Sequence, residues 1–124
     1  MIMKEEFVKN IFETIVKDGI LSYKELYDSV EISDKTIDYW KNSLHLYRSL
    51  DEKEKELFIQ IIKQTIIDTI STVFGVFDGS CSLNSGEYII HVNINGEDTE
   101  NELQDCFLEY VENNDSVNWS NNNE

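Results

Sequence analysis

Residues 51–74 read DEKEKELFIQIIKQTIIDTISTVF, and this stretch decides the fold. Within it a large apolar side chain recurs every four residues, at Phe58, Ile62, Ile66, Ile70 and Phe74. Apolar residues at this spacing fall on one face of a helix. The pattern therefore predicts a long central helix over residues 51–74, around which the rest of the chain packs.

Local signals place the two ends of this helix. Ser49 and Glu52 stand three residues apart, the spacing of a capping box, in which each side chain bonds the other residue's backbone N–H. They predict the start of the helix. β-branched residues crowd the other end, so for residues 69–77 a strand is the alternative to a helix.

Three shorter helices are predicted before the central one. Apolar residues at helical spacing cover residues 3–18, and Gly19 follows them as a C-cap would. Ser22 with Glu25 forms a capping box that opens a second helix. A hydroxyl or carboxylate at residues 33–34 caps a third. The apolar side of this third helix carries Ile37, Trp40, Leu44 and Tyr47.

Beyond the central helix the pattern changes from helical to alternating. Asp78-Gly79 and Ser85-Gly86 are turn pairs, and apolar residues alternate over 87–94, which predicts a strand. The partner of this strand is either residues 80–84 or the stretch before Asp78. Both pairings make a small β-hairpin near residues 80–94, and Asn95-Gly96 ends the strand.

A last helix and a tail complete the chain. Thr99 with Glu102 supplies a capping box. The apolar side of the helix that follows carries Leu103, Phe107, Tyr110 and Val111. Residues 114–124 are acidic and rich in Asn, and we expect a mobile tail there. The expected fold is mainly α within the α+β class, with about five helices around helix 51–74, in one globular domain of residues 1–113.

Charge is the most informative feature of the composition. Asp and Glu number 25 against 10 Lys and Arg, which gives a formal net charge of −15. The last basic residue is Lys63, so the charged residues of segment 75–124 are all Asp or Glu. Such a segment attracts basic surfaces and repels nucleic acid. Direct binding of DNA or RNA by this half is therefore not expected.

The carboxylates near the last helix form a regular row. Asp98, Glu102, Asp105, Glu109 and Glu112 recur at steps of four and three residues, which places them on one helix face. The alternative is the ordinary outer face of an amphipathic helix. Like charges at this spacing cost stability, and mixed signs would also give solubility, so the row favours binding of a basic partner. Candidate aromatic anchors for that partner are Tyr88, Tyr110 and Trp119.

Signatures of catalysis and metal binding are missing from the sequence. HExxH, CxxC, GxSxG and phosphate-loop patterns do not occur, so no catalytic residue, metal or cofactor is predicted and the chain is not expected to be an enzyme. The remaining enzymatic hypothesis builds a site from Asp68, His91 and Asp105. A structural role is favoured for Asp68, either a hydrogen bond to a loop or a pair with Arg48.

Other features bear on location and redox state. The start MIMKEEFVKN has no apolar run of signal-peptide length, which predicts a cytoplasmic protein. Lys63 and Asp68 interrupt the apolar stretch 57–77, so no membrane span is expected. Cys81 and Cys106 are expected to be reduced, with a disulfide between the loop and the last helix as the alternative.

The segments IIKQTIIDTISTVFGVFDG (residues 61–79) and LQDCFLEYVE (residues 103–112) resemble small acidic proteins of bacterial toxin–immunity and phage–host conflict systems. What this resemblance implies is a stoichiometric protein inhibitor. An immunity protein and an anti-defence inhibitor are equally compatible with it.

These observations favour an acidic protein-binding inhibitor of a basic, nucleic-acid-handling protein. One form of this hypothesis is nucleic-acid mimicry, in which the carboxylate row takes the place of phosphates. The alternative is an oligomeric structural or accessory protein, in which the central helix or a strand edge self-associates and acidity serves only solubility. Either a monomer or a homodimer is expected.

Overall fold

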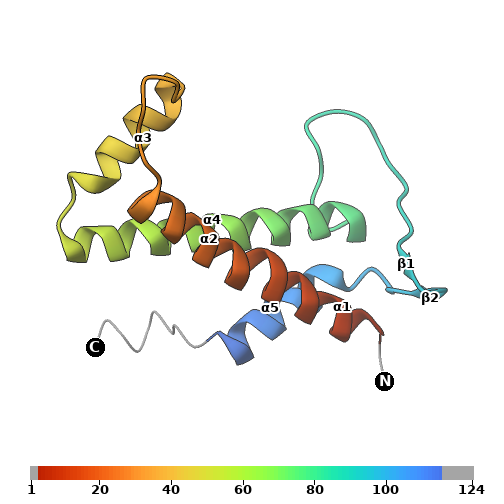
Figure 1. Cartoon of the computed structure of the whole chain (residues 1–124). Helices are drawn as coiled ribbons and strands as arrows, with labels where there is room; N and C mark the ends of the chain where they lie inside the picture. Colours follow the sequence, from red (N-terminus) through yellow and green to blue (C-terminus); the bar gives the residue numbers. More distant parts are fainter. Residues whose placement is uncertain (1–2, 116–124) are drawn as a thin grey trace. The chain divides into compact units, whose positions relative to one another are not determined.

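The computed structural model describes residues 3–115 and shows a mainly helical fold with one small antiparallel hairpin (Figure 1). The predicted fold class is therefore confirmed. Almost all of the predicted tail, residues 114–124, lies outside the described residues.

The first helix is longer than predicted. Helices α1 (Met3–Ile11) and α2 (Asp18–Ser29) are joined without a break by η1 (Phe12–Lys17), a stretch of π-helix. Gly19 therefore lies inside a helix, and the Ser22–Glu25 pair does not open a new one, so both predicted boundaries were wrong. A glycine inside a helix costs roughly 1 kcal/mol. Burial of apolar side chains along the same helix offsets this cost.

Helix α3 (Asp38–Arg48) starts later than predicted. The residues expected to cap it form a turn instead: Ser33 N donates to Thr36 Oγ1 at 3.0 Å, and Lys35 N donates to Ser33 Oγ at 3.2 Å. Ile37 therefore precedes the helix and is exposed, whereas Leu44 and Tyr47 are buried as predicted. The Ser33 hydroxyl is used for a local turn, a common alternative to capping.

Helix α4 (Glu52–Asp78) is the predicted central helix, with four more residues at its end. The strand alternative for residues 69–77 was wrong. A different capping box starts the helix: Asp51 N donates to Glu54 Oε1 at 3.0 Å, and Glu54 N donates to Asp51 Oδ1 at 2.8 Å. The predicted Ser49–Glu52 box is not formed, because the Ser49 hydroxyl donates to the carbonyl of Leu46.

The buried line along α4 differs from the four-residue repeat in the sequence. Phe58, Ile62, Ile66 and Ile70 are only half-buried, and Phe74 alone of that repeat is buried. The buried residues of α4 are Ile67, Ser71, Phe74 and Gly75. Their spacing of four, three and one follows the true 3.6-residue period of a helix, whereas a strict repeat of four drifts around it.

This difference gives a prediction for paired alanine substitutions. Ile67→Ala should lower the free energy of unfolding by about 2–5 kcal/mol, because it removes a buried side chain and leaves a cavity. Ile66→Ala should lower the free energy of unfolding by only about 1 kcal/mol, because the Ile66 side chain is half-buried. Urea unfolding of both variants checks the ranking. A larger loss at Ile66 would restore the four-residue repeat as the core line.

The hairpin lies further along the chain than predicted. Strand β1 (Asn93–Ile94) pairs antiparallel with β2 (Glu97–Asp98), in the register Asn93 with Asp98 and Ile94 with Glu97. Asn95-Gly96 ends strand β1, as predicted, and also forms the turn of the hairpin, with φ of 51° and 85°. Two positive φ values in a two-residue loop are typical of a type I′ turn, for which Asn-Gly is the favoured pair. The predicted partners of the strand, residues 80–84 or those before Asp78, were wrong.

Helix α5 (Leu103–Asn114) is capped by a residue distant in sequence. Asp78, the last residue of α4, accepts a hydrogen bond at Oδ2 from Gln104 N at 2.7 Å. The predicted capping box of Thr99 and Glu102 is not formed, because Glu102 N donates to the Thr99 carbonyl at 3.1 Å. The prediction of the last helix was right, and the prediction of its cap was wrong.

Gln104 ties the start of α5 to the end of α4. Its side chain accepts a hydrogen bond from Ser80 Oγ at 2.8 Å and donates to the Ser71 carbonyl at 3.0 Å. A glycine makes this approach possible: a Cβ at Gly75 would overlap Cys81 Sγ and lie 2.8 Å from Gln104 Nε2. Both cysteines are free, as predicted.

Residue contacts divide the chain into two compact units. Unit 2 is the continuous stretch Thr14–Ile67, and unit 1 combines Met1–Glu13 with Asp68–Glu124. Helix α4 and the long first helix each contribute residues to both units. The single domain of residues 1–113 stays a prediction.

The core of unit 2 is aromatic. Tyr27, Leu44 and Tyr47 are buried, and Phe58 packs against them. The ring centroids of Tyr27 and Tyr47 both lie within 5.3 Å of the Phe58 ring, in edge-to-face arrangements. Arg48 donates to the carbonyls of Tyr27 and Val30, which satisfies backbone oxygens at the end of α2.

The core of unit 1 forms where α1 packs against α5 and the end of α4. The Phe107 ring lies 5.7 Å from the Phe74 ring, and the Phe12 ring lies 5.5 Å from that of Tyr110. The other buried apolar side chains here are Val8 and Leu103. This core fixes the face of α5 that points inward.

One helix in the described part of the chain, α4, is long and apolar enough to cross a membrane by length and composition alone. Lys63 and Asp68 therefore do not by themselves make α4 too polar to cross a membrane. A mostly buried core helix of a soluble protein can have the same length and composition; α4 supplies core residues to both units, and 17% of its most apolar stretch is buried.

Candidate acidic interface

Most of the net negative charge lies in unit 1. Its described residues, 3–13 and 68–115, carry 14 Asp and Glu against two lysines, a formal charge of −12. Unit 2 carries ten acidic against eight basic residues, a formal charge of −2. The division into units therefore separates an acidic surface from one that is nearly balanced.

Helix α5 presents the carboxylate row to solvent. Leu103 and Phe107 are buried, one turn apart on the inward face. Asp105, Glu109 and Glu112 lie on the other side of the helix and are exposed. The row thus has the exposure that the sequence predicts for a partner-binding surface, and α5 contains no basic residue to neutralise it.

The first two members of the row are partly engaged within the molecule. Glu102 is exposed and its Oε1 lies 2.8 Å from Lys4 Nζ, and Glu100 Oε2 lies 3.7 Å from the same nitrogen. The hydrogen bond between Lys4 and Glu102 raises the pKa of the lysine and lowers that of the carboxyl. Asp98 accepts a hydrogen bond from Glu100 N at 2.8 Å.

This ion pair corrects one inference from the sequence. Residues 75–124 contain no basic residue, but Lys4, from the start of the chain, supplies a cation to them. Its side chain is only 14% exposed, so its charge is held against the carboxylates. On helix α5 itself, Asp105, Glu109 and Glu112 are the members of the row for which no ion pair is formed among residues 3–115.

A second helix adds carboxylate to the surface around Cys106. Burial raises the pKa of this thiol to about 11, and the nearby charges of Glu5, Glu109 and Glu102 act in the same direction. Glu5 lies on α1, which packs against α5. The periodicity of the last helix could not reveal the role of Glu5. Glu5 and Cys106 come together only because α1, near the start of the chain, packs against α5.

The three candidate anchors have different surroundings. Tyr110 packs edge-on against Phe12 and donates to Glu13 Oε1 at 3.1 Å, so its hydroxyl is engaged inside unit 1. Tyr88 is exposed, and its ring lies over Gly86. Trp119 lies outside the described residues.

The residues of the enzymatic hypothesis are spread over separate elements. Asp68 lies on α4, His91 on the loop before β1 and Asp105 on α5, and all three are exposed. Within residues 3–115, no group of three His, Cys, Asp or Glu side chains is arranged to hold a metal ion. The arrangement offers no buried base or nucleophile to activate.

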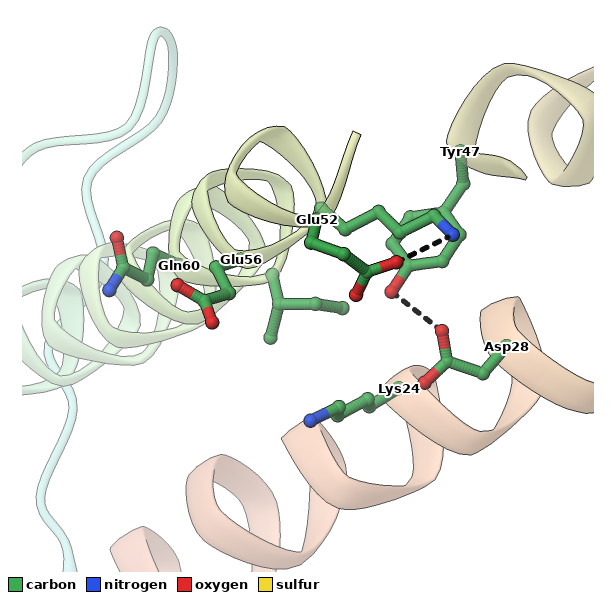
Figure 2. A pocket seen from close by; sticks show the side chains of 8 residues that line it. Lys24, Asp28, Tyr47, Glu52, Glu56 and Gln60 are labelled. Atoms are coloured by element: carbon green, nitrogen blue, oxygen red, sulfur yellow. Dashed lines mark hydrogen bonds and ion pairs between the residues drawn. The ribbon is translucent and has the colours of Figure 1, made fainter. Parts of the chain in front are cut away.

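Unit 2 contains a pocket of about 240 Å³ beside Tyr47 (Figure 2). The Tyr47 hydroxyl donates to Asp28 Oδ1 at 2.8 Å, and Lys55 Nζ lies 3.6 Å from Glu52 Oε1 and 5.5 Å from the centre of the Tyr47 ring. Burial and the bond to Asp28 raise the pKa of the Tyr47 phenol to about 12. A phenol with this pKa stays protonated at neutral pH, so it serves as a structural donor there.

Comparison with known proteins gave no match. No family model fits the chain, and no curated protein and no solved structure is significantly similar to it. The resemblance to immunity and anti-defence proteins is thus carried only by the segments 61–79 and 103–112.

Proposed function

We propose that this chain is an acidic protein-binding inhibitor, of the immunity or anti-defence type, that covers the positive site of a basic, nucleic-acid-handling protein in the cytoplasm. The observation that carries the proposal is the concentration of charge: unit 1 holds −12 of the net −15 in its described residues. A surface of one sign attracts a partner of the opposite sign and accelerates the encounter.

The exposed row on α5 is the proposed centre of contact. Asp105, Glu109 and Glu112 advance along the helix by about 5.4 Å per turn. Evenly spaced anions on a rigid helix fit a surface that binds the phosphates of a nucleic acid. Tyr88 is an exposed aromatic side chain of the same unit and can serve as an anchor.

The test removes the uncompensated charges without disturbing Lys4. The variant combines Asp105→Asn, Glu109→Gln and Glu112→Gln. The partner, isolated from the native host, should associate with this variant much more slowly than with the wild type. The wild-type rate should fall steeply with salt, because the Debye length shrinks from about 10 Å at 0.1 M to about 3 Å at 1 M. Stopped-flow association at several salt concentrations measures both effects.

A matched variant in unit 2 provides the control. Glu25→Gln, Glu31→Gln, Asp34→Asn removes the same number of exposed charges from the nearly balanced unit. It should leave the association rate close to wild type. Both variants should unfold at wild-type urea concentration or slightly higher, because like-charge repulsion is relieved. If the α5 variant associates at the wild-type rate with the wild-type salt dependence, α5 is not the contact surface.

A second candidate function is supported by the exposed apolar residues of α4. Leu57, Ile61 and Val73 are exposed on this helix. Only 17% of its most apolar window is fully buried. Such a helix is suited to self-association in an oligomeric structural or accessory protein. In this case the molecular mass in solution should rise with protein concentration for the wild type but not for Ile61→Glu. That result would favour this function over inhibition.

A further inference from the structure

The loop between α4 and β1 has unused backbone hydrogen-bonding groups. Cys81 N donates to the Gly75 carbonyl, and the Val92 carbonyl accepts from Thr99 N. Between these two points, no backbone–backbone hydrogen bond within residues 3–115 involves residues 82–91. Backbone N–H and C=O groups need partners, and here solvent or another chain must supply them.

The second half of this loop has the pattern of a strand without a neighbour. Ile90, Val92 and Ile94 are half-buried, whereas Ile89, at 91% exposure, and His91 face solvent. Burial that alternates every second residue is typical of an extended strand with one covered side. The β-branched residues in it also favour a sheet.

The pairing stops for a local reason. Strand β1 pairs with β2 for two residues, and one further hydrogen bond joins Thr99 N to the Val92 carbonyl. Glu100 and Asn101 then take positive φ values of 59° and 56°, which turn the chain toward α5. Residues 87–91 therefore precede β1 in the chain with no strand beside them among residues 3–115.

Charge identifies what can cover this segment. Between Gly79 and Gly96, Glu87 is the only Asp, Glu, Lys or Arg, although unit 1 as described carries −12. A second copy of so acidic a chain is repelled elsewhere on unit 1 but can approach along this nearly uncharged strand. A basic partner, by contrast, gains little electrostatic attraction along this strand and is steered first to α5.

We propose that two copies of this chain pair through residues 87–93 as antiparallel strands, with Ile90 opposite the partner's Ile90. This register places Tyr88 opposite the partner's Val92, an aromatic and β-branched pair that stabilises sheets. It places Glu87 opposite the partner's Asn93, so no carboxylates face each other. Moving the register by one residue would set the apolar side of one strand against the polar side of the other.

The experiment compares two tyrosines of equal exposure. Tyr88 is 66% exposed on the strand, and Tyr39 is 64% exposed on α3. Sedimentation equilibrium of the wild type should show a mass of twice 14.5 kDa at high protein concentration. Tyr88→Asp should remain a monomer, because an unpaired charge replaces the aromatic contact, and Tyr39→Asp should dimerise as the wild type does.

Salt separates this interface from the proposed inhibitor surface. Each chain has a formal net charge of −15, so the two copies repel each other. The affinity of the dimer should therefore rise between about 0.1 M and about 1 M salt, because salt screens this repulsion. Binding of a basic partner should weaken over the same range. Failure of one association therefore leaves the other testable.

Cysteine cross-linking checks the register. In a background of Cys81→Ser and Cys106→Ser, oxidised Ile90→Cys should form a covalent dimer far faster than Ile89→Cys, because only residue 90 faces its own copy. A wild type that stays monomeric at high salt and high concentration would overturn the proposal. So would a dimer that survives Tyr88→Asp, or equal cross-linking at both positions.

Discussion

Phe107→Ala should lower the free energy of unfolding by about 3–5 kcal/mol. Phe107 is fully buried in unit 1, and its ring lies edge-on to Phe74 at 5.7 Å between centroids. Alanine removes the ring and leaves a cavity between α5 and the end of α4, which close-packed neighbours cannot fill. Urea unfolding followed by circular dichroism measures the loss.

The neighbouring residue is the control for this substitution. Leu108→Ala lies in the same helix at a 40% exposed position, so its cost should be within about 1 kcal/mol. Helix propensity changes little in Leu108→Ala, because Leu and Ala are both good helix formers, and Phe107→Ala replaces a weaker helix former by a stronger one, so the loss expected there comes from packing. Equal losses at the two positions would mean that the inward face of α5 is not the one described.

In unit 2, Tyr47→Ala should lower the free energy of unfolding by a similar amount, about 3–5 kcal/mol. Its buried ring packs against Tyr27 and Phe58, both at 5.3 Å or less. Tyr47→Phe keeps the ring and removes only the hydrogen bond to Asp28, so it should cost about 0.5–1.5 kcal/mol. Near-equal losses would show that the hydroxyl, not the ring, holds this core.

The pair of Tyr47 variants also predicts a pH dependence. Because the folded chain raises the phenol pKa to about 12, the protonated phenol is favoured on folding. The resulting stability is complete below the ordinary tyrosine pKa of about 10 and is lost as pH rises toward 12. The stability difference between wild type and Tyr47→Phe should therefore shrink between those pH values, as urea unfolding at each pH would show.

Local periodicity was sufficient to place the central and last helices, although it did not give the buried line of the central one. The central helix, the last helix and its inward residues Leu103 and Phe107 follow from apolar spacing alone. Local capping signals were less reliable, because a hydroxyl and a glutamate three residues apart also occur inside helices, as Ser22 and Glu25 do in α2. At the start of α4, two overlapping pairs fit the same pattern, and Asp51 with Glu54 forms the box.

Contacts between distant residues could not be predicted from this one sequence. Asp78 caps α5 from 26 residues away, and Lys4 pairs with Glu102 across 98 residues. Both contacts depend on how the helices of unit 1 pack, which periodicity does not specify. The carboxylate row itself was predictable, because it needs only helical spacing. Its partial neutralisation by Lys4 was not.

The absence of basic residues after Lys63 decides which chemical methods can map this protein. Trypsin cleaves after Lys and Arg, so residues 64–124 leave a digest as one peptide. Amine-reactive cross-linkers will report almost entirely on unit 2, because unit 1 offers only Lys9 and the largely covered Lys4 among its described residues. Carboxylate-directed labels and a glutamate-specific protease are the reagents that reach α5 and the strand before it.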